Sequence, residues 1–164
     1  MKRVFLYASI GLILLMLFTA NSVVAAGWVT THDTNWTVAT IPSNIYGSPD
    51  QNVTSLGIRT NYTGAIMAII GNGFGSGSGY DIIVYGYDVD STTEQYEVYY
   101  GVWSSGYPEY MCAEPIGNAN DTDGAVGFEI GDHAETFNMV YLVALSGSGS
   151  TWPGPEIDAI YGVH

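Results

Sequence analysis

The chain has 164 residues and a formal net charge of −13, with 16 Asp and Glu against three Lys and Arg. Lys2 and Arg3 lie at the N-terminus, so only Arg59 follows residue 26, and one cation against 16 carboxylates leaves −15 on that part. Such a surface repels phosphate backbones and anionic headgroups, and it lacks the Lys and Arg contacts that bind them. Nucleic acids and anionic membrane surfaces are therefore excluded as partners.

Residues 1–26 predict a secretory signal peptide. A basic pair precedes the uncharged apolar run 4–17, and a Val/Ala-rich segment then matches a cleavage site. We expect cleavage after Ala26, or after Ala25. An uncleaved anchor is the alternative, because residues 4–26 are long enough to span a bilayer. Cleavage leaves 138 of the 164 residues, enough for one hydrophobic core, in a secreted protein.

Residues 27–41 predict an N-terminal arm rich in Thr, Val and Trp. The alternation places Trp36 and Val38 on one face of an extended segment. A free chain end can leave its own domain and complete the sheet of a neighbouring subunit. We therefore expect a donor strand, with Trp28, Trp36 and Val38 at the subunit interface.

Residues 42–164 predict one all-β domain, because apolar alternation in β-branched and aromatic residues dominates and no stretch has a clean helical period. Six to nine short strands separated by Gly, Pro, Asn and Asp favour a β-sandwich or jelly roll. The expected strands are 62–70, 80–89, 94–103, 125–130, 136–145 and 157–163, with weaker candidates at 35–41 and 53–58 and an irregular excursion at 107–123.

The glycine-rich segment 71–79 lies between two strong strands. A phosphate-binding loop needs a following helix and usually a lysine, and this segment precedes a predicted strand in a chain without nearby lysine. We therefore expect a flexible hairpin loop.

Two acidic segments are candidate Ca²⁺ sites, because Ca²⁺ takes six to eight oxygen ligands in flexible geometry. One is the run 118–124, which lacks the full EF-hand spacing, and the other is the predicted turn at 88–94. The candidate ligands are Asn118, Asn120, Asp121, Asp123, Asp88 and Asp90, with Glu94 in the second cluster. The alternative is that both acidic segments are solvated turns and that the acidity only keeps the protein soluble.

Residues typical of catalysis do not form a recognisable motif. Asp132, His133 and Glu135 offer ligands for a transition metal, but the three histidines of the chain are scattered and no nucleophile elbow occurs. Paired carboxylates of a glycoside hydrolase depend on spatial separation and stay open. We do not expect an enzyme. Cys112, the single cysteine, is expected to be a small buried hydrophobe.

Aromatic residues and sequons suggest glycans in two ways. Four tryptophans and many tyrosines could form a sugar-stacking platform, although they also fill cores and interfaces. N-x-S/T sequons make glycosylation a further expectation for a secreted chain. They are centred on Asn35, Asn52, Asn61 and Asn120.

The absence of lysine after residue 26 favours self-assembly, because natural β proteins commonly protect edge strands with lysine. In its signal, small β domain, polar arm and Gly/Thr/Tyr/acid composition, the chain resembles secreted β-sandwich filament subunits of prokaryotes. These are the TasA/camelysin-like group, archaeal bundling pili and calcium-dependent archaeal cannulae. The resemblance implies a cell-surface homopolymer held by donor-strand addition, with Ca²⁺ as a candidate cofactor. A secreted carbohydrate-binding module is the second reading, and a hydrolase is the third.

Overall fold

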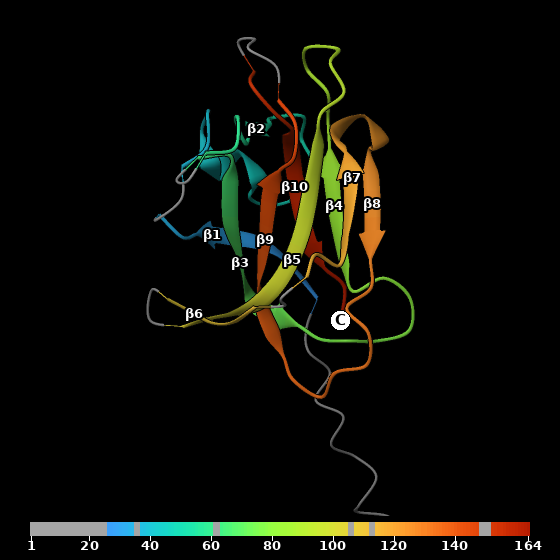
Figure 1. Ribbon diagram of the computed structural model, residues 1–164. Helices are drawn as coiled ribbons and strands as arrows, with labels where there is room; N and C mark the ends of the chain where they lie inside the picture. Colours follow the sequence, from blue (N-terminus) through green and yellow to red (C-terminus); the bar gives the residue numbers. More distant parts are fainter. Residues whose placement is uncertain (1–25, 35–36, 61–62, 105–106, 112–113, 148–151) are drawn as a thin grey trace, which may run out of the picture.

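The computed structural model describes residues 26–34, 37–60, 63–104, 107–111, 114–147 and 152–164, and between 107 and 111 it describes the backbone only. Ten strands and two short 3-10 helices lie within these ranges (Figure 1). They are β1 (Gly27–His32), η1 (Pro42–Ile45), β2 (Thr54–Ser55), β3 (Ala65–Phe74), β4 (Ile82–Gly86), β5 (Gln95–Ser104), β6 (Tyr107–Met111), β7 (Gly117–Asn120), η2 (Asp121–Asp123), β8 (Ala125–Phe128), β9 (Phe137–Ala144) and β10 (Glu156–Gly162).

The strands form two layers of antiparallel pairs, so the expectation of an all-β sandwich is confirmed. The first sheet has the order β6-β5-β9-β3, and β7 also pairs with β5. The second has the order β10-β4-β8, and β2 also pairs with β10. β1 connects the two layers, because it pairs with β3 on one side and β10 on the other. Figure 1 shows β3, β9 and β5 in front of β10 and β4.

β1 passes from one sheet to the other through an irregularity in its register. Trp28 pairs with Tyr161 of β10, whereas Val29 and Thr31 pair with Ile70 and Ile69 of β3. The register shifts between Val29 and Thr31, as expected where a strand changes sheets through a bulge or bend. The first part of the expected arm is thus a central strand of its own domain. The arm was expected to leave its own domain, but the structure pairs β1 with β10 and β3 of the same chain.

The main core lies between the two sheets. Alternate residues of β3, β5 and β9 face alternate residues of β4 and β10, and each fully buried aliphatic side chain contributes about 1.5–3 kcal/mol. The set includes Ile66, Ile70, Val98, Leu142, Ile82, Val84, Ile157 and Ile160, and all are at most 2% exposed. Strict alternation in β4 leaves Ile83 and Tyr85 on the outer side of the second sheet.

A second, smaller apolar cluster covers the outer face of the first sheet. Met67, Met139 and Tyr141 are buried there, with Tyr99 and Trp103 packed against them. The indole Nε1 of Trp103 donates to Oδ2 of Asp33 at 2.9 Å, which places the segment after β1 over this face. Burial raises the pKa of Tyr141 to about 12. This face is therefore part of the domain's own packing.

Two connections differ from their predicted form. β3 and β4 lie in different sheets, so segment 71–79 is not a hairpin loop. β3 instead runs to Phe74, after which the chain crosses between layers, and Gly75 N donates to the carbonyl of the C-terminal His164 at 2.7 Å. The region expected to be irregular, 107–123, contains β6, β7 and η2. Within the described residues, no helix combines the length and apolar character needed to cross a membrane.

Candidate functional site

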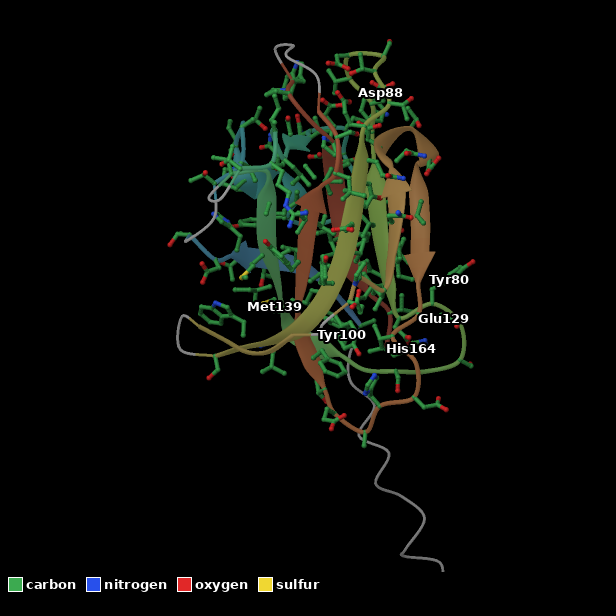
Figure 2. The ribbon with its side chains drawn as sticks, in the orientation of Figure 1. Tyr80, Asp88, Tyr100, Glu129, Met139 and His164 are labelled. Atoms are coloured by element: carbon green, nitrogen blue, oxygen red, sulfur yellow. The ribbon has the colours of Figure 1, made fainter. Side chains whose placement is uncertain are left out.

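One end of the sandwich gathers five carboxylates from three segments of the chain. Asp88 and Asp90 lie in the β4–β5 connection, and Glu94 directly precedes β5. Asp121 begins η2, and Glu156 begins β10. We call these five residues the acidic cluster. Asp88 lies at the end of the molecule opposite His164 in Figure 2.

The local backbone brings η2 against β4 because residue 86 is glycine. A Cβ at Gly86 would lie 2.5 Å from the carbonyl oxygen of Asp121, too close for any other residue without movement. Gly86 N also donates to the carbonyl of Gly124 at 2.9 Å. At the start of η2, Asn120 and Asp123 form a reciprocal capping box. These contacts hold Asp121 at the end of the second sheet.

Backbone donors fix the orientation of several of the carboxylates. Glu94 N donates to Asp121 Oδ1 at 3.1 Å, and Val89 N donates to Glu156 Oε2 at 3.4 Å. In the exposed part of the connection, Ser91 N donates to Asp88 Oδ1 at 2.6 Å. The acidic cluster is therefore built into the connections and is not a set of freely moving surface side chains.

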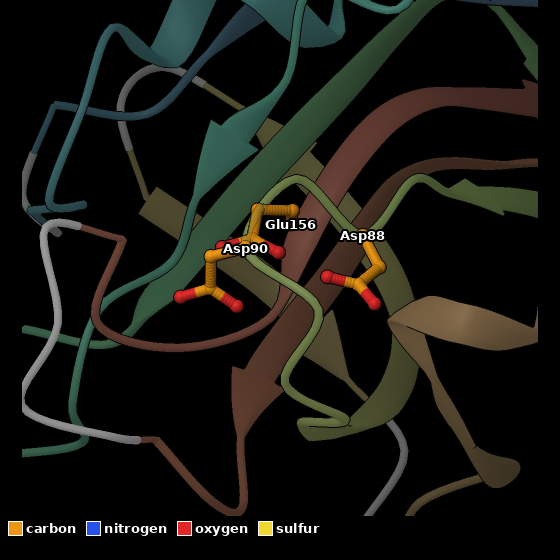
Figure 3. A group of neighbouring side chains, drawn as sticks. All are labelled: Asp88, Asp90 and Glu156. Atoms are coloured by element: carbon orange, nitrogen blue, oxygen red, sulfur yellow. The ribbon is translucent and has the colours of Figure 1, made fainter.

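Glu156 is common to two groups of three carboxylates. In one group it lies with Asp88 and Asp90, and one oxygen from each residue falls within 4.8 Å of the others (Figure 3). In the other it lies with Glu94 and Asp121 under the same limit. The second group is buried: Glu156 is 0% exposed, Asp121 1% and Glu94 2%. Such a set of convergent oxygens has the chemistry of a divalent-cation site.

Burial and mutual repulsion disfavour ionisation in this cluster. Desolvation is the main cause that raises the pKa of Glu156 to about 8; the hydrogen bond from the Val89 backbone lowers this pKa, and the charges of Asp121, Asp90 and Glu94 raise it further. Desolvation likewise raises the pKa of Asp121 to about 6. Burial, with the nearby charges of Asp123 and Asp121, raises the pKa of Tyr96. Each shift has the direction expected for acids enclosed without a compensating positive charge.

The structure brings together three of the six residues predicted as Ca²⁺ ligands, namely Asp88, Asp90 and Asp121. The other three, Asn118, Asn120 and Asp123, lie outside both groups of carboxylates. Both the backbone N and Nδ2 of Asn120 donate to Asp123 Oδ2, so these two residues serve the capping box.

Sequence reasoning missed Glu156 as a ligand and did not unite Glu94 with the run around Asp121. The signal for Glu156 was available, because it begins a buried strand that is apolar except for Asp158, and buried acids are unusual.

The outer face of the second sheet carries a row of aromatic and apolar side chains. Trp28, Tyr161 and Ile83 are consecutive cross-strand partners on β1, β10 and β4, so they share one face. The ring centroids of Trp28 and Tyr161 are 4.6 Å apart, and those of Trp28 and Tyr85 are 5.8 Å apart. Ala159 pairs with Tyr85 and is completely buried, as expected if neighbouring rings cover it.

The row continues onto β8 through Tyr80. Gly127 pairs with Ile83, and a Cβ at Gly127 would lie 2.2 Å from Cγ of Tyr80. The Tyr80 ring therefore occupies the side-chain position above Gly127, and Tyr80 is 57% exposed. Figure 2 shows Tyr80 at the margin of the second sheet. We call Trp28, Tyr80, Ile83, Tyr85 and Tyr161 the aromatic face.

The remaining predicted site residues have varied placements. Trp36, Asn35, Asn61 and Cys112 lie outside the described residues. Val38 is half-buried and packs against the main core of its own domain. Asn52 is exposed, and its Nδ2 donates to Asp50 Oδ2 at 2.8 Å.

The three histidines make separate contacts. His32 contacts the Tyr46 hydroxyl and His133 the Tyr100 hydroxyl, while His164 lies 3.9 Å from Asp81. His133 Nδ1 is also 3.7 Å from Glu135 Oε2. The groups of acidic and imidazole ligands found among the described residues contain no histidine, and the transition-metal alternative gains no support.

The fold and these sites define a small β-sandwich domain with an acidic end and an aromatic outer face. No protein-family model matches the sequence, and no curated protein matches it. Among solved structures, the chain is similar to the CBM32, a carbohydrate-binding module, of AlyQ in complex with 4,5-unsaturated mannuronic acid. The identity is 16% and the TM-score 0.47, and the similarity covers 86% of this chain and 95% of the other.

Proposed function

We infer that this chain is a secreted carbohydrate-binding domain and that the aromatic face is its contact surface for sugar. The observation that carries the proposal is the row of rings on the outer side of the second sheet, where they do not contribute to the main core. Trp28 packs against both Tyr85 and Tyr161, and Tyr80 extends the row with an exposed ring. Clustered apolar surface of this kind, outside the core, marks interaction sites.

Aromatic rings suit sugars because the electron-rich ring face attracts the polarised C–H bonds of a pyranose, while a tyrosine hydroxyl bonds to sugar hydroxyls. The Trp28 ring is tilted by 44° to Tyr85 and by 45° to Tyr161, so the rings do not form one plane. A flat crystalline polysaccharide would need coplanar rings. The tilted arrangement supports recognition of a soluble oligosaccharide, whose successive sugar rings also change inclination.

The negative charge of the chain favours neutral over anionic sugars as ligands. The chain carries 16 Asp and Glu and, after residue 26, one Lys or Arg, which is Arg59. Arg59 contacts Glu97, with Nη1 to Oε2 at 3.8 Å, on the first sheet and away from the aromatic face. An anionic glycan would therefore meet net repulsion with no cation to bind its carboxylate or sulfate. We expect neutral glycans to be the ligands.

Glycan arrays followed by calorimetry with the best neutral oligosaccharide test this proposal. Tyr161→Ala and Tyr80→Ala should each weaken binding at least about tenfold, which corresponds to about 1.4 kcal/mol. Tyr99→Ala is the matched control, because Tyr99 is a half-buried tyrosine that packs on the outer face of the other sheet. Equal loss of binding in all three variants, or no binding by the intact protein to any neutral glycan, would refute the assignment.

Self-assembly into a filament is the second candidate function, and one observation favours it. β8 is an edge strand that pairs only with β4 among the described strands, and its sequence AVGF contains no charged residue to oppose pairing with another chain. Donor-strand exchange by β1 would require the strand to leave two hydrogen-bonded neighbours, β3 and β10. Electron microscopy and sedimentation of the secreted protein distinguish a polymer from a monomeric binding domain.

A further inference from the structure

We propose that the acidic cluster is a calcium site, in which Glu94, Asp121 and Glu156 form the buried part and Asp88 and Asp90 the outer part. This site is separate from the aromatic face and does not depend on glycan binding. It differs from either acidic segment of the sequence taken alone, because its central residue, Glu156, lies in neither segment.

The one Lys or Arg of the described residues does not offset the charge of this cluster, because Arg59 contacts Glu97 on the first sheet. The groups found here contain carboxylates alone. Burying ionised carboxylates without a partner is strongly unfavourable, so they must either hold protons or receive a cation.

Hydrogen bonding of the buried carboxylates in this cluster is incomplete, which is an observation independent of charge. Glu156 Oε1 and Asp121 Oδ2 are buried oxygens without a hydrogen-bond partner, in side chains that are 0% and 1% exposed. Both residues belong to the buried group, in which one oxygen from each side chain lies within 4.8 Å of the others. Buried acceptors without donors are rare in native proteins, and a bound ion is one of the accepted explanations.

Two other buried aspartates of the same domain accept hydrogen bonds from backbone N–H groups on both carboxylate oxygens. Asp81 Oδ1 accepts from Gly77 N and its Oδ2 from Ile130 N, both at 2.8 Å. Asp158 accepts backbone N–H groups of Asp50 and Gln51 at 3.1 to 3.2 Å on its two oxygens. The protein thus satisfies buried carboxylates with backbone donors where no ion is needed. Asp121 and Glu156 lack such a complete set.

Because all ligands of this site are carboxylate oxygens, it favours Ca²⁺ over other divalent metal ions. Ca²⁺ binds oxygens at 2.3–2.6 Å, so two oxygens on opposite sides of one ion are at most about 5 Å apart, which accommodates the 4.8 Å limit within each group. Mg²⁺ requires a regular octahedron at about 2.1 Å and prefers to keep several waters, which a buried group of carboxylates disfavours. Zn²⁺, Cu²⁺ and Ni²⁺ favour nitrogen or sulfur ligands, and neither group contains His or Cys.

A bound ion would link three parts of the fold. It would tie the β4–β5 connection, through Asp88 and Asp90, to η2, through Asp121, and to β10, through Glu156. The ion would thereby stabilise folding, because it binds the native arrangement and not the unfolded chain.

Metal-stripped protein provides the direct test. Calorimetric titration with CaCl₂ should show saturable binding, and MgCl₂ should bind at least about tenfold more weakly. Sensitised Tb³⁺ luminescence should appear and be displaced by Ca²⁺. CaCl₂ should raise the Tm above the value in NaCl of equal ionic strength. If NaCl raises the Tm equally and no saturable heat is measured, the effect is charge screening and the site does not exist.

Matched variants locate the ion. Glu156→Gln keeps the shape and removes the charge, and it should weaken Ca²⁺ binding by about 100-fold or more. Asp88→Asn, at the half-exposed outer part, should fold normally and weaken binding by a smaller factor. Glu129→Gln is the control, because it removes an equal charge from an exposed residue outside both groups. Unchanged Ca²⁺ affinity in Glu156→Gln and Asp88→Asn would overturn the proposal even if the protein binds Ca²⁺ elsewhere.

Discussion

Glu156→Gln is predicted to stabilise the metal-free protein at neutral and alkaline pH. Glu156 has a pKa of about 8 in the folded protein against an ordinary value of 4.5, chiefly because of its burial. The folded state therefore holds this proton more tightly than the unfolded state does. The contribution of Glu156 to the free energy of unfolding is fully present below pH 4.5 and is lost as the pH rises towards 8. Glutamine has no such titration, so the variant should keep its stability across this range.

The magnitude follows from the difference between the two pKa values. Each pH unit between them corresponds to about 1.4 kcal/mol, so the variant should exceed the parent by about 3 kcal/mol at pH 7 and nearly 5 kcal/mol at pH 9. For a domain of this size, about 3 kcal/mol amounts to roughly 10 °C in Tm. Part of this pKa shift comes from repulsion by Asp121, Asp90 and Glu94, which salt and solvent screen, so these values are upper limits.

The assay is urea unfolding with a strong chelator present, at pH 5 and pH 8, for the parent, Glu156→Gln and the Glu129→Gln control. The gap between parent and Glu156→Gln should be small at pH 5 and large at pH 8, whereas the control should follow the parent at both. Saturating Ca²⁺ should narrow the gap at pH 8 by about 2.7 kcal/mol or more, because a 100-fold weaker affinity of the variant corresponds to that difference in stabilisation. A pH-independent gap in the chelator would show that Glu156 is not a strained acid in the folded protein.

Three further predictions concern other parts of the chain. Gly86→Ala should destabilise the domain by about 1–3 kcal/mol and weaken Ca²⁺ binding, because its Cβ would displace the backbone of Asp121; urea unfolding and calorimetry measure both effects. Peptide mapping of the secreted protein from a glycosylating host should find glycan at Asn52, which is exposed, and none at Asn120, which is half-buried. Intact mass should place the mature N-terminus at or next to Gly27, and recovery of the full chain from membranes would instead favour an uncleaved anchor.

Sequence periodicity was sufficient for the long strands of the domain. Alternation of β-branched and aromatic residues over 94–103 and 136–145 matches β5 (Gln95–Ser104) and β9 (Phe137–Ala144) closely. Their many apolar residues on one face carry the signal. β7 (Gly117–Asn120) was missed because its sequence GNAN has one apolar residue and turn-forming neighbours. Pairing with β5 determines its conformation, and that is a tertiary effect.

Connections were harder to predict than strands. A loop of glycines between two strong strands fits both a hairpin and a crossover between layers, since composition does not reveal which strands become neighbours. The same limitation affected β1. Its six residues were assigned to an arm because the sequence shows a free end and polar threonines. The structure inserts them between β3 and β10, where Val29 is 1% exposed.

The high acidity of the chain had two interpretations, solubility and cation binding, and the positions of individual carboxylates separate them. Exposed acids such as Glu129 and Glu135 need only water and serve solubility. Buried Asp81 accepts backbone N–H groups on both oxygens and holds loops in place without any ion. Asp121 and Glu156 differ from both kinds, because they are buried, face other carboxylates and keep oxygens without donors. These few buried oxygens at one end of the sandwich, and not the net charge of the chain, therefore indicate a cation site. A chain of equal net charge with only exposed acids would give no reason to expect such a site.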